Sequence, residues 1–213
     1  MKLNREIISI AIIWLFHVSG ILGIIYGNSE WFISATPLNL SINFALLLIN
    51  CNSHKWFFYM VILAFLTGMI TEILGVRRGW IFGDYQYGDA LGYKILGVPI
   101  LIGVNWALLT IITAAIAQQF YENLFMRIVI GVCLMIFLDL LIEPIAPVLD
   151  FWAFEGGDAP LQNYIGWTAV ALFLQSIFHY FRLEVKGWFP NQLYLLQIIF
   201  FTVLLIKQNT IGI

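Results

Sequence analysis

The sequence predicts an all-α fold in which residues 1–213 form one polytopic bundle of transmembrane helices. Hydrophobic residues make up 62% of the 213 residues and charged residues 10%, whereas about half of the residues of a soluble domain are polar. The apolar residues gather in windows of about 20 residues, the length that a helix needs to cross a bilayer. Because backbone groups in lipid must be paired within the segment, these windows indicate helices rather than strands.

Seven such windows follow one another along the chain. The second is the weakest, because Pro37, Asn39 and Asn43 interrupt it, and a bundle of six helices is therefore the alternative. Pro144 and Pro147 cannot donate to the carbonyl groups one turn earlier, so the fifth helix should bend near them. The expected spans are residues 7–26, 31–50, 56–74, 96–117, 125–149, 163–181 and 190–206.

Basic residues in short loops favour a cytoplasmic N-terminus, as expected of a protein in the cell membrane. In this orientation the inner side holds more lysines and arginines than the outer side. The inner set is Lys2, Arg5, Lys55, Arg127, Arg182 and Lys186, and the outer set is Arg77, Arg78, Lys94 and Lys207.

Two connections between the expected helices, residues 75–96 and 150–163, are longer than the others and rich in glycine and aromatic residues. This composition indicates loops that pack against the protein rather than extend into solvent. Counting helices places both loops on the same side of the membrane, whichever orientation and helix number is correct.

The two loops and the helices beside them resemble each other. Four elements recur in the same order, with gaps confined to the loops, which we interpret as a weak parallel repeat with a site between its two copies. Glu72 is followed by Trp80-x-Phe82, Gly88-Asp89-Ala90, Pro99 and Trp106, and Glu143 by Trp152-x-Phe154, Gly157-Asp158-Ala159, Pro160 and Trp167.

Three carboxylates stand in FLDLLIEPIAPVLDFW, residues 137–152, at the end of a long apolar run. Asp139 falls about fourteen residues into its window, roughly 21 Å along a helix, and an ionisable group at that depth costs a few kcal/mol. Glu143 lies one helical turn further along the same face. Glu72 is expected on the same side of the membrane as Glu143.

Burial disfavours the charged form of a carboxyl group, so Asp139 or Glu143 is expected to stay protonated near neutral pH and to act as a proton donor. The alternative is structural: the acids pair with Arg77, Arg78 or buried amides and only hold helices together. Asp150 is the weakest of the catalytic candidates, because its place in the sequence is close to the membrane interface.

Several other chemistries find no support in the sequence. A net charge of −2 does not indicate a nucleic-acid partner, and no glycine-rich loop predicts a phosphate site. Cys51 and Cys133 match no metal or redox spacing. His17, His54 and His179 fall on different segments, which argues against a membrane di-iron enzyme. No metal or cofactor is expected.

Acids and aromatic residues remain as the basis of a site. Aromatic rings face cations favourably, so acids with aromatic walls in an apolar pocket suit the protonation of an alkene to a carbocation. An aromatic belt at the membrane interface is the alternative explanation for about half of these rings. The aromatic residues are Trp80, Tyr85, Tyr87, Trp106, Trp152, Phe154 and Trp167.

Two segments of the sequence contain most of the residues singled out above, together with further motifs at defined spacings. They read TEILGVRRGWIFGDYQYGDALGYKILGVPILIGVNW and DLLIEPIAPVLDFWAFEGGDAPLQNYIGW, within residues 68–168. This half of the chain resembles the CruF-type carotenoid biosynthesis proteins, which are integral-membrane carotenoid hydratases. The matching elements are Glu72, Gly75, Phe82-Gly83-x-Tyr85-x-Tyr87, Leu91-Gly92, Gly97-Val98-Pro99, Asp139, Glu143-Pro144 and Pro160-Leu161-x-Asn163-Tyr164-x-Gly166-Trp167.

The chain departs from that family pattern in two places. Glu143-Pro144 stands where an Asp-Pro pair is more usual, and Trp152-Ala153-Phe154 stands in place of two tryptophans. Neither departure removes a chemical group that the reaction needs, but both bear on the choice of substrate.

The resemblance implies addition of water across the terminal 1,2 (or 1′,2′) double bond of an acyclic carotenoid end, of the lycopene or γ-carotene type, without a cofactor. Asp139 or Glu143 is expected to protonate C-2, and Glu72 to position and deprotonate the water that attacks the tertiary cation at C-1. Asn105 and Asn163 are expected to orient that water, with helix–helix hydrogen bonding as the alternative. The expected substrate-binding residues are Trp80, Phe82, Tyr85, Tyr87, Asn105, Trp106, Trp152, Asn163 and Trp167.

Other functions start from the same residues. A membrane lycopene-type cyclase begins with the same protonation but lets an internal alkene trap the cation. A retinal-binding or polyene-binding seven-helix protein is the alternative from another class, although Lys207 stands at the very end of the last window, a shallow place for a Schiff base. A transporter would need a pair of broken helices, which the sequence does not predict.

Overall fold

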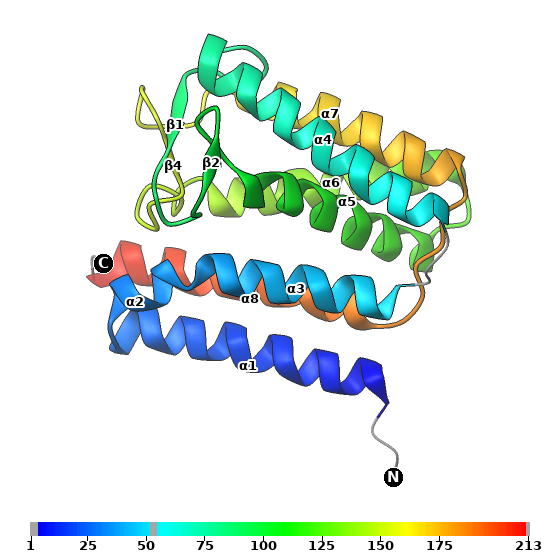
Figure 1. Ribbon diagram of the computed structural model, residues 1–213, viewed down its shortest axis with the longest axis horizontal. Helices are drawn as coiled ribbons and strands as arrows, with labels where there is room; N and C mark the ends of the chain where they lie inside the picture. The colour runs from blue at the N-terminus through cyan, green and yellow to red at the C-terminus, as the bar shows by residue number, and fades with distance from the viewer. Residues whose placement is uncertain (1–3, 52–54, 212–213) are drawn as a thin grey trace.

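Long helices lie side by side through most of the protein (Figure 1). The computed structural model describes residues 4–51 and 55–211, so Lys2 and His54 lie outside the described residues. The helices are α1 (Arg5–Tyr26), α2 (Ser29–Ser34), α3 (Thr36–Asn50), α4 (Lys55–Arg78), α5 (Ile100–Phe120), α6 (Leu124–Ile142), α7 (Leu161–Tyr180) and α8 (Phe189–Ile211).

Six segments of the described chain are long and apolar enough to cross a membrane: α1, α2 with α3, α4, α5, α6 and α8. α7 has 20 residues and lies against α4, α5 and α6, but polar residues such as Gln162, Asn163 and Gln175 lower its hydropathy. Each of the seven predicted windows thus overlaps a helical segment, and the predicted fold class, an all-α polytopic membrane bundle, is confirmed.

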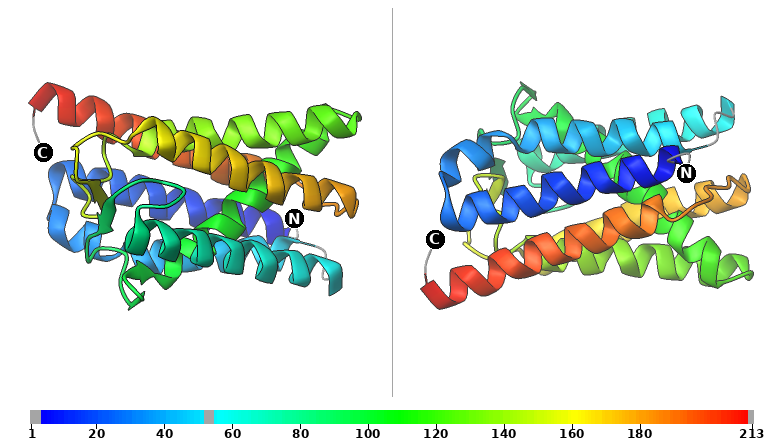
Figure 2. Two further views of the ribbon diagram at one scale, coloured as in Figure 1. Left: turned by 90° about the horizontal axis from the view of Figure 1, so that it is seen from above. Right: turned by 90° about the horizontal axis from the view of Figure 1, so that it is seen from below.

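The helices form two groups that face each other. Figure 1 shows α4, α5, α6 and α7 in an upper group and α1, α3 and α8 in a lower group, and the views in Figure 2 agree. α5 lies at the centre and contacts helices of both groups, and most of its residues are buried. Small residues permit this close packing: a Cβ added at Gly68 of α4 would meet the Trp106 ring of α5 at 2.5 Å.

The second predicted span is divided by a proline. α2 ends at Ser34 and α3 begins at Thr36, with Pro37 in its first turn. Pro37 has no N–H to donate to the carbonyl of Ile33, and its ring crowds that carbonyl, so the helix is interrupted there. The break changes the direction of the chain at the same end of the bundle as the two long loops (Figure 1).

Two predicted boundaries are wrong because of residues next to a proline or a glycine. The fifth helix was expected to bend and continue to residue 149, but α6 ends at Ile142 and residues 143–150 form successive turns. The fourth was expected from residue 96, but Lys94–Ile95 (β2) and Val98–Pro99 (β3) form a hairpin before α5. Its two-residue turn uses Leu96 and Gly97 at positive φ, as tight hairpin turns require.

The two long loops pair with each other, which confirms that they are packed and lie on one side. Tyr85–Tyr87 (β1) pairs antiparallel with Trp152–Phe154 (β4), with Tyr87 opposite Trp152 and Tyr85 opposite Phe154. Figure 1 shows this ribbon and the C-terminus at one end of the bundle and the N-terminus at the other. The ribbon thereby covers the ends of α4 and α6, where the predicted acids lie.

The two copies of the interpreted repeat correspond only in part. Pro99 is the N-cap of α5 and Pro160 that of α7, and the tryptophan seven residues after each proline enters one stacked pair, with the ring centroids of Trp106 and Trp167 4.1 Å apart. The Trp-x-Phe elements do not correspond, because Trp152–Phe154 forms β4 whereas Trp80 is exposed beside a bend.

Candidate active site

Glu72 lies near the end of α4, buried beneath the ribbon. Its Oε2 atom accepts hydrogen bonds from the hydroxyl groups of Tyr85, at 2.5 Å, and Tyr87, at 2.7 Å. Its Oε1 atom accepts one from Nε1 of Trp106, at 2.9 Å. Three donors from β1 and α5 therefore converge on one carboxylate, an arrangement that stabilises negative charge.

Asp139 and Glu143 form a second acidic group at the end of α6. Asn163, in the first turn of α7, bridges them: its Nδ2 atom donates to Oδ2 of Asp139 at 3.3 Å and to Oε1 of Glu143 at 3.0 Å. Oε2 of Glu143 accepts a hydrogen bond from Nε1 of Trp152 at 3.2 Å. Oδ1 of Asp139 is buried and has no hydrogen-bond partner among the described residues.

No cation offsets the charge of these acids within the described part of the chain. The ion pairs found there join Lys94 to Asp89 and Lys186 to Glu184, so neither Arg77 nor Arg78 neutralises the site. The structural alternative of arginine pairing is therefore wrong for these acids, although the pairing with a buried amide, Asn163, is present. Two carboxylates that share one buried site cannot both ionise readily.

Groups of the site that lie outside the spanning helices titrate far from their ordinary ranges. Glu143 is one residue beyond the end of α6, and burial raises its pKa to about 7, against the opposing effect of hydrogen bonds from Trp152 and Asn163. Burial and the charge of Glu72 raise the pKa of Tyr85 and of Tyr87. Both tyrosine hydroxyl groups therefore remain protonated donors at neutral pH.

The two acidic groups border one small cavity. Its volume is about 20 Å³, enough for about one water molecule. Glu72 and Glu143 both line it, and the other lining residues are Phe82, Tyr85, Tyr87, Ile102, Asn105, Trp106, Trp152, Phe154, Asn163 and Trp167. We call this space the acid chamber.

Aromatic rings form most of the wall of the acid chamber. Phe82 stacks on Trp106 with ring centroids 6.2 Å apart, and the ring centroids of Tyr85 and Phe154 are 5.2 Å apart. Tyr87 meets Trp152 edge to face at 6.1 Å. Every aromatic ring in this wall comes from β1, β4, α5, α7 or the segment before β1, so the pairing of the two loops is what assembles it.

Two predicted site residues lie elsewhere. Asp150 is exposed, and its Oδ2 atom accepts hydrogen bonds from the backbone N–H groups of Asp89, at 2.7 Å, and Ala90, at 3.0 Å. Trp80 is 56% exposed, and the guanidinium of Arg78 lies over its ring. Neither residue lines the acid chamber.

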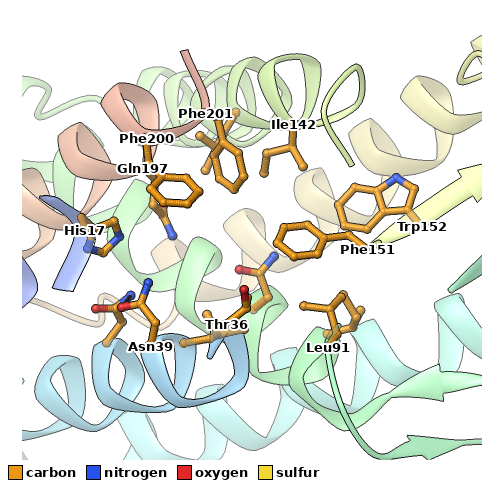
Figure 3. Close-up of a pocket in the computed structure, with 15 residues that line it drawn as sticks. His17, Thr36, Asn39, Leu91, Ile142, Phe151, Trp152, Gln197, Phe200 and Phe201 are labelled. Carbon is orange, nitrogen blue, oxygen red and sulfur yellow. Dashed lines mark hydrogen bonds between the residues drawn. The ribbon is translucent and has the colours of Figure 1, made fainter. Parts of the chain in front are cut away.

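A larger cavity of about 90 Å³ adjoins the acid chamber, and Ile102, Asn105 and Trp152 line both spaces. It lies between the two groups of helices, and Figure 3 shows Leu91, Ile142, Phe151 and Trp152 gathered on one side of it. We call it the inter-group cavity. A third space of about 140 Å³ shares Thr36, Asn39 and Phe200 with it and reaches residues next to the α2–α3 break.

Sequence reasoning missed the lining of the inter-group cavity that comes from α1, α3 and α8. Asn39 and Asn43, four residues apart in an apolar window, were a usable signal, because residues at this spacing share a helix face. Gln197 and Phe200 of α8 gave no comparable signal. Among the described residues no group of three histidine, cysteine, aspartate or glutamate side chains is placed to hold a metal ion.

Comparison with known proteins adds a family. The family model described as "Carotenoid biosynthesis protein" matches residues 35–212. A similar protein, the bisanhydrobacterioruberin hydratase of Haloarcula japonica, is 31% identical over 115 residues, which cover 48% of this chain and 39% of the relative. The match thus spans well under half of that relative. No solved structure matches the chain.

Proposed function

Because this chain belongs to the carotenoid biosynthesis protein family, we propose that it is a carotenoid hydratase. The reaction is the addition of water across the terminal 1,2 double bond of an acyclic carotenoid end, which gives a tertiary alcohol. The similar Haloarcula japonica protein is named a hydratase, which supports this class of reaction. The substrate is a carotenoid with an acyclic end, of the lycopene or γ-carotene type.

One observation carries the proposal: two acidic groups that differ in their hydrogen-bond donors border one chamber of about the size of a water molecule. Glu72 accepts three hydrogen bonds from neutral donors and so suits the negatively charged role of a base. Asp139 and Glu143 share a single amide donor, Asn163, and so suit the retention of a proton. Carboxyl groups whose environments differ in this way can serve as acid and base in one reaction.

The proton moves first to C-2 of the alkene, from the acid pair Asp139–Glu143. The π electrons form the new C–H bond, and C-1 becomes a tertiary cation that faces the aromatic walls, chiefly Trp152 and Tyr87. Water in the acid chamber then forms a bond to C-1, and Glu72 accepts the proton that this water loses. Glu72 and Glu143 line the same chamber, so a water molecule can return that proton to the acid pair.

The rest of the polyene extends away from the acids. The inter-group cavity opens from the acid chamber past Asn105 and Trp152, and the space beside it continues to the exposed Trp31 and Leu38 at the α2–α3 break. The three neighbouring spaces, lined mainly but not only by apolar side chains, offer a route from lipid to the acids. A linear hydrocarbon enters such a route from the bilayer without crossing water.

The test is expression in cells that make an acyclic-ended carotenoid, followed by mass analysis of the extracted pigment. We expect a product eighteen mass units heavier from the natural chain, because one water is added. Asp139→Asn and Glu143→Gln should each lower product formation by roughly a hundredfold or more, as expected when a general acid is removed. Full hydration by both variants would contradict the proposed acid pair.

Glu155→Gln is the matched control, because Glu155 is exposed in the same loop as β4 and does not line the acid chamber. It should leave the amount of product unchanged. The same assay separates the hydratase from a cyclase, which begins with the same protonation but yields a product of unchanged mass. The cavity beside Glu72, with room for a water molecule, favours the hydratase.

A further inference from the structure

A cluster of polar side chains lies in the inter-group cavity, away from the acids. It consists of His17 of α1, Asn39 and Asn43 of α3 and Gln197 of α8. We call it the polar cluster. Figure 3 shows His17, Asn39 and Gln197 on the side of the cavity opposite Phe151 and Trp152. The mechanism proposed above uses none of these four residues.

Two acceptors of the polar cluster are unused. Oδ1 of Asn43 and Oε1 of Gln197 are buried and accept no hydrogen bond from any described residue, and the two residues are 2% and 7% exposed. A buried polar atom without a partner is costly. Two separate helices, α3 and α8, bring such atoms to one mainly apolar cavity, which indicates a bound group that completes their hydrogen bonds.

His17 adds a third acceptor. Its Nδ1 atom lies 2.8 Å from the backbone carbonyl oxygen of Ile13, which can only accept, so Nδ1 carries the hydrogen. Nε2 is then the acceptor of the neutral ring. Asn43 uses its Nδ2 atom to donate to Oδ1 of Asn39, at 3.3 Å. Donation to this cluster is therefore the main requirement of its ligand.

A hydroxyl group satisfies that requirement best. It donates one hydrogen bond and accepts others, so it pairs with the amides of Asn43 and Gln197 whichever way these are turned. A ketone cannot donate. An ammonium group would be buried without a counter-charge, because no carboxylate lines this cavity, and that burial is costly.

We propose that the polar cluster binds a hydroxyl group that the substrate already carries, so that the protein acts on a hydroxylated polyene in preference to the pure hydrocarbon. This inference rests on the proposed function, because the acid chamber defines the reacting end of the substrate. A cavity of about 90 Å³ is much smaller than a whole carotenoid. The hydroxyl group and the reacting double bond therefore belong to the same end of the substrate.

The test compares two short probes that share one terminal trisubstituted alkene: linalool, which carries a hydroxyl group, and the hydrocarbon myrcene, which does not. Their Kd values are measured by titration calorimetry on the full chain in detergent. We expect linalool to bind on the order of tenfold more tightly, because the unpaired acceptors gain a donor. Equal Kd values for the natural chain would overturn the inference, since water alone would then satisfy the cluster.

Gln197→Leu and Asn43→Leu each remove one acceptor and should reduce the tenfold preference severalfold, through weaker binding of linalool rather than of myrcene. Asn50→Leu is the matched control, because Asn50 lies on the same helix as Asn43 but bonds the carbonyl of Leu46; it should keep the preference. Detergent partitioning of the probes is the same for every variant and cancels in this comparison. A preference that persists unchanged in both acceptor variants would overturn the inference.

The outcome is separable from that of the proposed function. Glu143→Gln should lose hydration of a carotenoid but keep the preference for linalool, because Glu143 lines the acid chamber and not the inter-group cavity. A natural chain that prefers linalool but hydrates no carotenoid would overturn the proposed function and leave the hydroxyl site standing. A natural chain that hydrates carotenoids but binds linalool and myrcene equally would overturn the hydroxyl site and leave the proposed function standing.

Discussion

Glu72 and Glu143 are the same side chain in two surroundings, and the proposed division of roles between base and acid rests on that difference. Glu72 lies among three donors, whereas Glu143 receives one hydrogen bond from Trp152 and shares a donor with Asp139. Hydrogen bonds to a carboxylate stabilise its charged form, whereas burial and a neighbouring carboxylate favour the protonated form. The sequence shows both residues as acids in apolar surroundings, but not which donors the fold brings to each.

The first prediction concerns the pH dependence of hydration. Burial raises the pKa of Glu143 to about 7, and the acid pair must hold a proton for the alkene to be protonated. The rate should therefore fall as pH rises above about 7, by about tenfold for each further pH unit. The measurement is kcat/KM for carotenoid hydration in liposomes between about pH 5 and about pH 9.

Trp152→Phe sharpens this prediction. The indole N–H of Trp152 donates to Glu143 and so lowers its pKa; without it the pKa should rise, and the decline in rate should move to higher pH. Trp80→Phe is the control, because Trp80 is exposed and outside the acid chamber. If the rate of Trp152→Phe declined at the same pH as that of the natural chain, Glu143 would not be the group whose loss of a proton causes the decline.

The β1–β4 ribbon is the element that converts two loops into a site. The sequence predicts two packed loops on one side, because both are rich in glycine and aromatic residues, and this much is confirmed. Their antiparallel pairing, with Tyr87 opposite Trp152, could not be predicted, since strands of three residues have no periodicity to detect. Helix ends were missed for a related reason: the residues around Pro99 and Pro144 form turns that hydrophobicity alone does not reveal.

The second prediction concerns Asp150, which ties the two loops together. Its carboxylate accepts two backbone hydrogen bonds from the loop that carries β1, and a Cβ added at Gly88 would meet its Oδ1 atom at 2.1 Å. Asp150→Ala should lower the free energy of unfolding by about 1 kcal/mol and Tm by about 3 °C. Gly88→Ala should act in the same direction, because it displaces the same carboxylate.

The readout for Asp150 is thermal unfolding in detergent beside hydration of a carotenoid. Asp150→Ala should keep most of its hydration at a temperature well below Tm, unlike Glu143→Gln. If Asp150→Ala instead abolished hydration with its Tm unchanged, Asp150 would take part in the chemistry, as predicted from the sequence.

At the scale of the whole molecule, the inter-group cavity depends on contacts that only the folded bundle makes. Glu72, Asp139, Glu143 and Asn163 were predicted from a segment of about a hundred residues, because they stand near one another in the sequence or in a recognisable pattern. His17 and Gln197 stand at opposite ends of the chain, and α1 meets α8 only in the folded protein. Nothing in either helix alone indicates a shared cavity.

The third prediction concerns the orientation of the bundle. Both long loops and the C-terminus lie at the end opposite the N-terminus (Figure 1), and the excess of basic residues at the N-terminal end favours the cytoplasm for that end. The acid chamber should therefore lie toward the outer surface. The test starts from a variant without Cys51 and Cys133, to which Gly156→Cys adds a single cysteine. This cysteine should react with a membrane-impermeant maleimide in intact cells, because Gly156 is exposed and nothing lies within 4 Å of a Cβ added there.

Glu122→Cys is the matched reporter for the other end, because Glu122 is exposed in the connection between α5 and α6. It should react only after the membrane is permeabilised. The opposite labelling pattern would reverse the orientation and place the acid chamber on the cytoplasmic side, without changing the bundle. Labelling of both cysteines in intact cells would contradict the bundle itself, because α6, which lies between Glu122 and Gly156, must then fail to carry the chain from one surface to the other.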